Sequence, residues 1–97
     1  MKDRIATLKK AIIHYGREQQ LNIAIEEMSE LTKEICKWKR GVDNRDAIIE
    51  EMADVYIMLW QMQFMFNVNP VLELDAKMQE KINRLNDRLN IEREVKQ

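Results

Sequence analysis

The sequence predicts an all-α protein, and three observations lead to this prediction. The 97-residue chain contains only two Gly and one Pro, so few residues can break or turn a helix. Glu, Lys, Leu, Ile and Met, which suit helices, dominate the composition. Apolar residues recur three and four positions apart, the spacing of one helix face. We therefore expect a single domain over residues 1–97 with four helices.

The first two predicted helices are separated by a glycine. The first runs from about Asp3 to Tyr15 with Asp3 as its cap, and the second from about Gln19 to Lys39. Gly16, between them, either ends the first helix or only weakens it. The second helix has an apolar stripe close to a heptad pattern, formed by Leu21, Ala24, Ile25, Met28, Leu31, Ile35 and Trp38.

The third predicted helix, from about Asp46 as its cap to Phe66, is apolar all round. It follows a turn that contains Gly41, a residue suited to a helix C-terminus. A helix that is apolar all round should be surrounded, and three other helices offer little to surround it. We therefore expect part of its surface to pack against a second subunit.

The fourth predicted helix begins after a capping Asn69 and Pro70, a favourable helix start. It has one narrow apolar stripe, formed by Leu74, Met78, Ile82, Leu85 and Leu89. Residues 90–97 are charged, and we expect them to form a tail that can fray.

Charge and hydropathy argue against several classes of function. Sixteen basic and seventeen acidic residues nearly cancel, and no stretch is basic enough to indicate a nucleic acid polymer as the ligand. The longest apolar run, Val55 to Trp60, is too short to span a bilayer, and no signal core follows the amino terminus. We expect a cytoplasmic protein without a membrane partner. Cys36 is the single cysteine, and we give it no chemical role.

Two acidic clusters are the most informative feature of the sequence. Each contains two carboxylates three residues apart, Glu27 with Glu30 and Glu51 with Asp54. Positions i and i+3 of a helix lie one turn apart on the same face, so each pair can point toward one spot. Two such helices packed side by side would bring four carboxylates together.

The second pair lies on an apolar face of the third helix, where two ionised groups are costly. Protonation, basic partners or a divalent cation could relieve this cost. A hard cation such as Mg²⁺ prefers oxygen ligands, keeps some waters and is often shared with substrate phosphates. Together the two pairs therefore favour a Mg²⁺ site formed by Glu27, Glu30, Glu51 and Asp54.

Other interpretations of these acids remain open. A lone ExxE pattern is typical of a solvated face that pairs with Lys or Arg one turn away, and Lys33 and Lys37 are available. Glu34 could be a fifth ligand of the metal, but we expect it to form a surface salt bridge instead. Glu50 is a candidate partner of the ligands, about 100° away around the helix.

A basic stripe follows the fourth helix at helical spacing: Lys77, Lys81, Arg84 and Arg88. Lys and Arg beside a metal site can stabilise the negative charge that develops on a leaving pyrophosphate. The alternative is that these residues pair with Glu73, Glu80 and Asp87 on the helix surface.

Taken together, these residues resemble the MazG-like branch of the all-α nucleoside triphosphate pyrophosphatases, a family marked by ExxE, a variable spacer and ExxD. Glu27-Met-Ser-Glu30 and Glu51-Met-Ala-Asp54 match this pattern, as do the wider strings EEMSEL and EEMADV. The segment KINRLNDRL, Lys81 to Leu89, is similar to the basic C-terminal segment of the family. The resemblance covers roughly Gln20 to Leu89.

The resemblance implies a helical bundle, four helices to a protomer, that assembles as a homodimer or homotetramer and binds Mg²⁺, with Mn²⁺ able to substitute, through the four acids. It implies hydrolysis of a (d)NTP to a (d)NMP and pyrophosphate, with metal-activated water attacking the α-phosphorus. Glu30 would act as the general base, and Lys81, Arg84 and Arg88 would hold the β and γ phosphates, with Lys77 as an additional candidate.

The sequence leaves the base, the sugar, the number of metal ions and the physiological role open. Trp38, Tyr56 and Trp60 could stack on a base, although aromatic residues at helical spacing more often belong to a core. One rival is a phosphoribosyl-ATP pyrophosphatase of the same superfamily. The string EEMADV resembles the second acidic motif of that enzyme. The other is a non-catalytic helical dimer that acts as an adaptor or regulator, with solvated acids.

Overall fold

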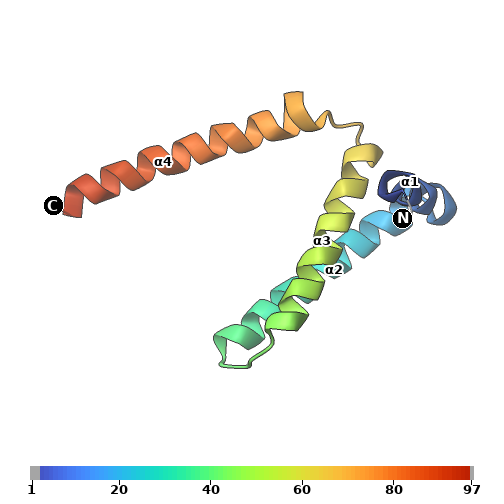
Figure 1. Cartoon of the computed structure of the whole chain (residues 1–97), viewed down its shortest axis with the longest axis horizontal. Helices are drawn as coiled ribbons and strands as arrows, with labels where there is room; N and C mark the ends of the chain where they lie inside the picture. Colours follow the sequence, from blue (N-terminus) through green and yellow to red (C-terminus); the bar gives the residue numbers. More distant parts are fainter. Residues whose placement is uncertain (1–2, 97) are drawn as a thin grey trace. The chain divides into compact units, whose positions relative to one another are not determined.

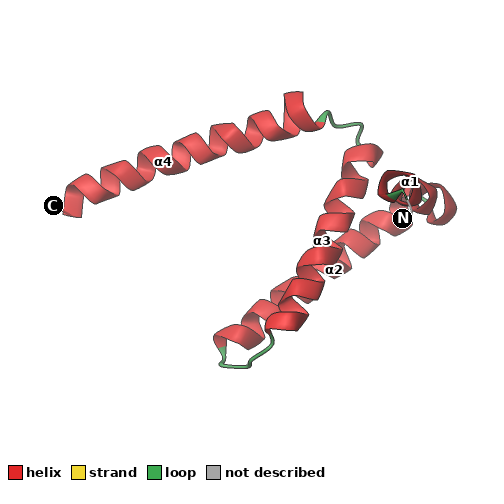
Figure 2. Ribbon diagram, in the orientation of Figure 1, coloured by secondary structure: helices red, strands yellow, loops and turns green. Residues whose placement is uncertain are grey.

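The computed structural model describes residues 3–96, which are helical apart from short connections and include no strand. The predicted all-α class and its four helices are confirmed (Figure 2). The elements are α1 (Arg4–Tyr15), α2 (Arg17–Lys39), α3 (Arg45–Met65), a short π-helical segment η1 (Pro70–Asp75) and α4 (Ala76–Lys96).

Local side-chain chemistry explains where α1 starts and stops. The Asp3 carboxylate accepts hydrogen bonds from the backbone N–H groups of Ile5 and Ala6 at 3.0 and 3.4 Å, so the predicted cap is confirmed. Gly16 ends α1 rather than merely weakening it, with φ 89° and ψ 153°, a conformation that favours glycine. α2 begins at the next residue, Arg17, two positions earlier than expected.

The turn between α2 and α3 differs in one detail from the sequence prediction. Gly41 follows α2 with a φ of 92°, in keeping with its predicted place at the helix C-terminus. The predicted cap of α3 at Asp46 is wrong, because Asn44 occupies the cap position and Asp46 lies in the first helical turn. The Asn44 side chain does not cap α3 and instead bonds to α2.

The chain from Val68 onward begins as predicted and remains helical. The Asn69 side chain accepts hydrogen bonds from the N–H groups of Val71 and Leu72 at 3.0 and 2.9 Å, and Pro70 is the first residue of η1. α4 then continues to Lys96, so residues 90–96, where we expected a fraying tail, are helical; Gln97 lies outside the described residues.

The described residues divide into two compact units. The first ends at Asn67 and contains α1, α2 and α3; the second starts at Val68 and contains η1 and α4. Within the first unit α2 and α3 run antiparallel side by side, and α1 contacts both (Figure 1). No described helix has both the length and the apolarity needed to cross a membrane.

The core of the first unit lies between α2 and α3 and is small. Among the described residues only Ala24 and Gln20 of α2 and Met58 and Gln61 of α3 are buried. The expectation that α3 is surrounded is not met within the first unit. Large apolar side chains of α3 remain 41–68% exposed: Ile49, Met52, Tyr56, Ile57 and Leu59.

Candidate metal centre

Three carboxylates meet where α2 and α3 pack together. One oxygen from each of Glu27, Glu51 and Asp54 lies within 4.8 Å of the others. Glu27 comes from α2, and Glu51 and Asp54 come from α3. Residues about 25 positions apart in the sequence are thus brought together by the antiparallel packing of two helices.

The helical repeat explains why these three acids converge. Glu27 is one turn after Ala24, a buried residue at the contact with α3, so its side chain points the same way. Asp54 is one turn before the buried Met58, and Glu51 is one turn earlier still. The acids therefore occupy the same faces as the core residues, and Glu27 and Glu51 are partly buried.

The electrostatics of this cluster disfavour three bare charges. Burial, together with the neighbouring carboxyl groups of Asp54 and Glu51, raises the pKa of Glu27 to about 7. Glu51 Oε2 is buried and has no hydrogen-bond partner. Among the described residues the ion pairs are Lys37 with Glu34 and Lys77 with Glu80, so no basic side chain neutralises the cluster.

Glu30, the fourth predicted ligand, is not part of the cluster. It is exposed on α2, whereas Glu27 is partly buried. Three residues on an α-helix leave an offset of about 60°, so when Glu27 faces α3, Glu30 turns toward the solvent. On α3, Glu51 and Asp54 are also about 60° apart around the helix axis. The buried Met58 points in a direction between them, so both acids face α2.

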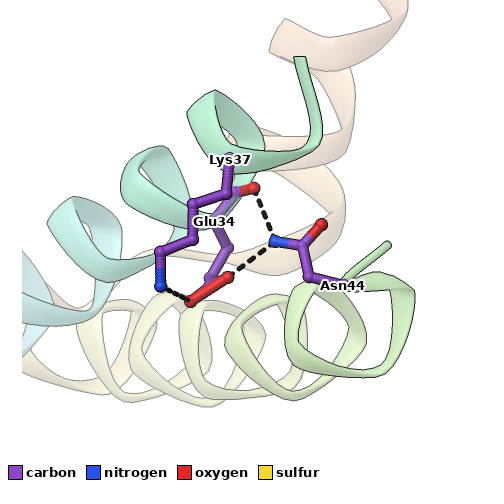
Figure 3. Close-up of polar contacts among 3 residues, drawn as sticks. All are labelled: Glu34, Lys37 and Asn44. Atoms are coloured by element: carbon purple, nitrogen blue, oxygen red, sulfur yellow. Dashed lines mark hydrogen bonds and ion pairs between the residues drawn. The ribbon is translucent and has the colours of Figure 1, made fainter. Parts of the chain in front are cut away.

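Glu34 has partners of its own at the end of the α2–α3 hairpin (Figure 3). Lys37 Nζ donates to its carboxylate at 3.2 Å, and Asn44 Nδ2 donates both to that carboxylate at 2.7 Å and to the Glu34 backbone carbonyl at 2.9 Å. These bonds lower the pKa of Glu34, with Asn44 as the largest cause. The predicted salt bridge is therefore confirmed, and Glu34 is held away from a ligand role.

Two further candidates of the sequence lie outside the cluster. Glu50 is exposed on α3. Trp38 is 51% exposed and lies eleven residues after Glu27, about 16 Å farther along the axis of α2.

The basic stripe lies on α4 in the second unit. Lys77 pairs with Glu80 at 3.7 Å, as the surface interpretation expected. No ion pair within the described chain involves Lys81, Arg84 or Arg88. Three of the four cations thus have no carboxylate partner on their own helix.

The donor set fits a hard divalent cation. It consists of carboxylate oxygens alone, which suit Mg²⁺ or Mn²⁺ and not structural zinc. The unpartnered oxygen of Glu51 is the kind of buried acceptor that a cation satisfies. A cation would also favour the charged form of Glu27 and so counteract the effect of burial and of the neighbouring carboxyl groups on its pKa.

Asn44 has a structural role that sequence reasoning missed. It lies in the turn between the helices, a common place for Asn, and its side chain ties the end of α2 to the start of α3. The signal was an Asn in a turn, and its partner ten residues earlier could not be read from local pattern.

No protein-family model matches this chain, and no curated protein or solved structure matches it. Any function assigned to the chain therefore depends on its own residues and their geometry.

Proposed function

We propose that this protein is a Mg²⁺-dependent nucleoside triphosphate pyrophosphohydrolase of the MazG-like type, which hydrolyses a (d)NTP to a (d)NMP and pyrophosphate. The observation that supports this proposal most strongly is the convergence of Glu27, Glu51 and Asp54 from two helices, with no basic partner among residues 3–96. A solvated acidic face would not place a carboxylate oxygen of Glu51 in a buried, unpaired position.

The site offers few ligands, which favours a shared metal over a closed structural one. Three carboxylates leave coordination positions of Mg²⁺ for water and for substrate oxygens. Phosphate chains are the usual biological partners of such an open Mg²⁺ site. When bound, Mg²⁺ would neutralise the triphosphate and lower the pKa of a coordinated water.

The proposal assigns metal binding, proton transfer and phosphate binding to different side chains. Glu27, Glu51 and Asp54 would hold the cation, and Glu30, which is exposed one turn beyond Glu27 on α2, would act as general base on a water molecule. By the resemblance to the basic C-terminal segment of the family, Lys81, Arg84 and Arg88 would hold the β and γ phosphates.

The same proposal includes assembly of the protomers into a dimer or a dimer of dimers with helical bundles. The exposed apolar side chains of α3 support this part, since the other helices of the first unit leave them uncovered. The proposed compartment is the cytoplasm.

A pyrophosphate-release screen tests the activity. The screen covers canonical and modified (d)NTPs and phosphoribosyl-ATP with Mg²⁺. We expect release from nucleoside triphosphates by the wild type, a loss of at least about a hundredfold in Glu51→Gln and Asp54→Asn, and near-normal activity in the exposed control Glu26→Gln.

Three results separate the rivals. Release from phosphoribosyl-ATP alone would identify the histidine-synthesis activity. Full activity in both acid variants would show that the site is elsewhere. No release from any nucleotide, with no Mg²⁺ effect on the melting temperature, would favour the non-catalytic adaptor.

A further inference from the structure

The two sides of the α2–α3 hairpin differ in what covers them. The side of α3 that carries Ala53, Ile57 and Trp60 faces α1, and the two helices line a groove there. Among residues 3–67 no helix covers the other side of the hairpin, which we call the open face. Its exposed apolar residues are Ile25, Met28 and Ile35 of α2 and Met52 and Leu59 of α3.

The helical repeat separates the two sides of α3. Met52 and Leu59 are rotated by about 120° and 100° around the helix axis from the buried Met58, which points at α2. Ile57 and Trp60, beside α1, are rotated from Met58 in the opposite sense, by about 100° and 160°. The contact with α1 therefore leaves Met52 and Leu59 uncovered.

The exposed apolar residues of α2 lie on the same side of the hairpin. Ile25 and Met28 are rotated by about 100° and 40° from the buried Ala24, in the same sense as the open-face residues of α3 from their own buried neighbour. Because α2 and α3 run antiparallel, rotations of the same sense point to one side. Ile35 of α2 and Ile48 of α3 line one pocket on this side, which joins the two helices into a single face.

The chemistry of the open face suits a second copy of itself. Met28 and Thr32 of α2 and Met52 and Val55 of α3 occupy its centre, and none of them is charged. Two copies can therefore meet face to face without placing like charges against each other. Methionine is also enriched at protein–protein interfaces relative to the rest of the surface.

The exposed area is that of a stable interface. The five apolar side chains of the open face are 38–64% exposed, and Trp38, which lines the same pocket as Ile35, is 51% exposed. Together they present on the order of 600 Å² of surface, if a large side chain exposes about 200 Å² in full. Each partner in a specific protein–protein interface buries roughly 600–1,000 Å².

The small core of the first unit indicates a cover that is always present. Ala24 and Met58 are the only buried apolar residues among those described, so packing within the unit stabilises it little. A protomer with so small a core gains its stability from an obligate interface. A second copy of the chain is the one partner that is present wherever the chain is made.

We infer that two copies of the chain pair through their open faces, α2 and α3 of one copy against α2 and α3 of the other, with the two metal centres outside this interface. Glu27 and Asp54 are rotated by about 60° and 40° from Ala24 and Met58, in the sense opposite to the open face. They therefore lean toward the other side of the hairpin. The inference rests on the assembly that the proposed function includes, and it adds the surface that forms the assembly.

Light scattering of variants that carry a charge in the open face tests the inference. Ile25→Glu and Met28→Glu should each reduce the molecular mass to half that of the wild type, because a charge in an apolar interface has no partner. Asn22→Glu adds the same charge on the solvent side of α2, about 160° from Ala24, and should keep the wild-type mass. Circular dichroism shows whether the variants remain helical.

Spin labels test the same surface while the interface is intact. Cys36→Ser removes the single cysteine, and Ser29→Cys then places one label per chain at the rim of the open face. Helices packed across an interface lie about 8–10 Å apart, so the labels of two copies should be within about 30 Å and show dipolar coupling. Adding Met28→Glu should abolish the coupling.

Two outcomes overturn the inference. An assembly that keeps its mass in Ile25→Glu and Met28→Glu and shows no coupling between labels would assign the interface to another surface. A monomeric wild type that Ile25→Glu destabilises would mean that another segment of the same chain covers the open face. Neither test uses a metal or a nucleotide. Hydrolysis of nucleotides by a monomer would thus refute this inference alone, and an inactive dimer would refute the proposed activity alone.

Discussion

At the level of single residues, Glu27 is held where its charge is disfavoured. Its ordinary pKa of 4.5 rises to about 7 in the folded protein, chiefly through burial. Between these two pH values the folded chain binds more protons than the unfolded chain. The contribution of Glu27 to the free energy of unfolding is therefore greatest below pH 4.5 and falls as the pH rises toward 7.

Replacing Glu27 should remove this part of the pH dependence. Thermal melts of metal-free protein between pH 4.5 and 7 should show the wild type losing stability relative to Glu27→Gln as the pH rises. Glu26→Gln, one residue away and exposed, should keep the wild-type slope. Parallel curves for the wild type and Glu27→Gln would contradict the raised pKa.

Asn44 allows a second prediction, with the opposite sign. In the wild type, Asn44 and Lys37 lower the pKa of Glu34, so their stabilising effect is present above pH 4.5 and is lost as the pH falls through the lowered pKa. Asn44→Asp replaces the donor with a second carboxylate. Its melting temperature should be below that of the wild type at pH 7, and the gap should narrow in acid.

Circular dichroism melts at pH 7 and at a pH below 4.5 measure this difference in melting temperature between Asn44→Asp and the wild type. The control is Asp43→Asn, which changes the charge at the exposed neighbouring position. Its melting temperature should equal that of the wild type at both pH values. An equal loss at neutral and acid pH would mean that the Asn44 bonds act without the charge of Glu34.

At the level of helices, the sequence predicted what local chemistry determines. Asp3 and Asn69 cap the elements that follow them, because each side chain needs only N–H groups two and three residues ahead. The prediction that Asp46 caps α3 is wrong because a tertiary contact, and not local sequence, determines where α3 begins. Asn44, two residues earlier, takes the cap position while its side chain bonds to Glu34.

Gly16 gives a prediction at this level. Its φ of 89° and ψ of 153° are almost restricted to glycine, yet an added Cβ would meet no atom within 4 Å. Gly16→Ala should therefore lower the free energy of unfolding by about 1–3 kcal/mol through backbone strain alone. Denaturant titration measures this, with Asn22→Ala at an exposed position of α2 as the control.

No loss of stability in Gly16→Ala would mean that the break between α1 and α2 does not depend on the glycine conformation. The two helices would then form one longer helix at little cost.

At the level of the whole molecule, the exposed apolar face of α3 bears on assembly. Met52 and Leu59 are seven residues apart on one face of α3 and are 43% and 41% exposed. If a second copy covers them, Met52→Glu and Leu59→Glu should convert a dimer or tetramer to smaller species in light scattering. Lys33→Glu, on an exposed part of α2, should keep the wild-type mass, and a monomeric wild type would refute this assembly.

The sequence predicted the convergence of three acids, because carboxylate spacing on a helix indicates which acids can share a face. Glu51 and Asp54 fulfilled that expectation, and Glu27 joined them. The exposed position of Glu30 could not be foreseen, since it depends on how α2 is rotated against α3. The contact between α1 and α3, which forms a groove lined by Leu8, Tyr56 and Trp60, is likewise not specified by any local pattern.

Binding of a divalent cation by Glu27, Glu51 and Asp54 is the claim on which the proposed chemistry depends. Titration with Mn²⁺, followed by the electron paramagnetic resonance signal of the free ion, measures it without any nucleotide. We expect saturable binding to the wild type and to the control Glu26→Gln, and at least about tenfold weaker binding to Glu51→Gln and Asp54→Asn. Equal binding by all four proteins, or none by the wild type, would contradict a metal centre at these residues.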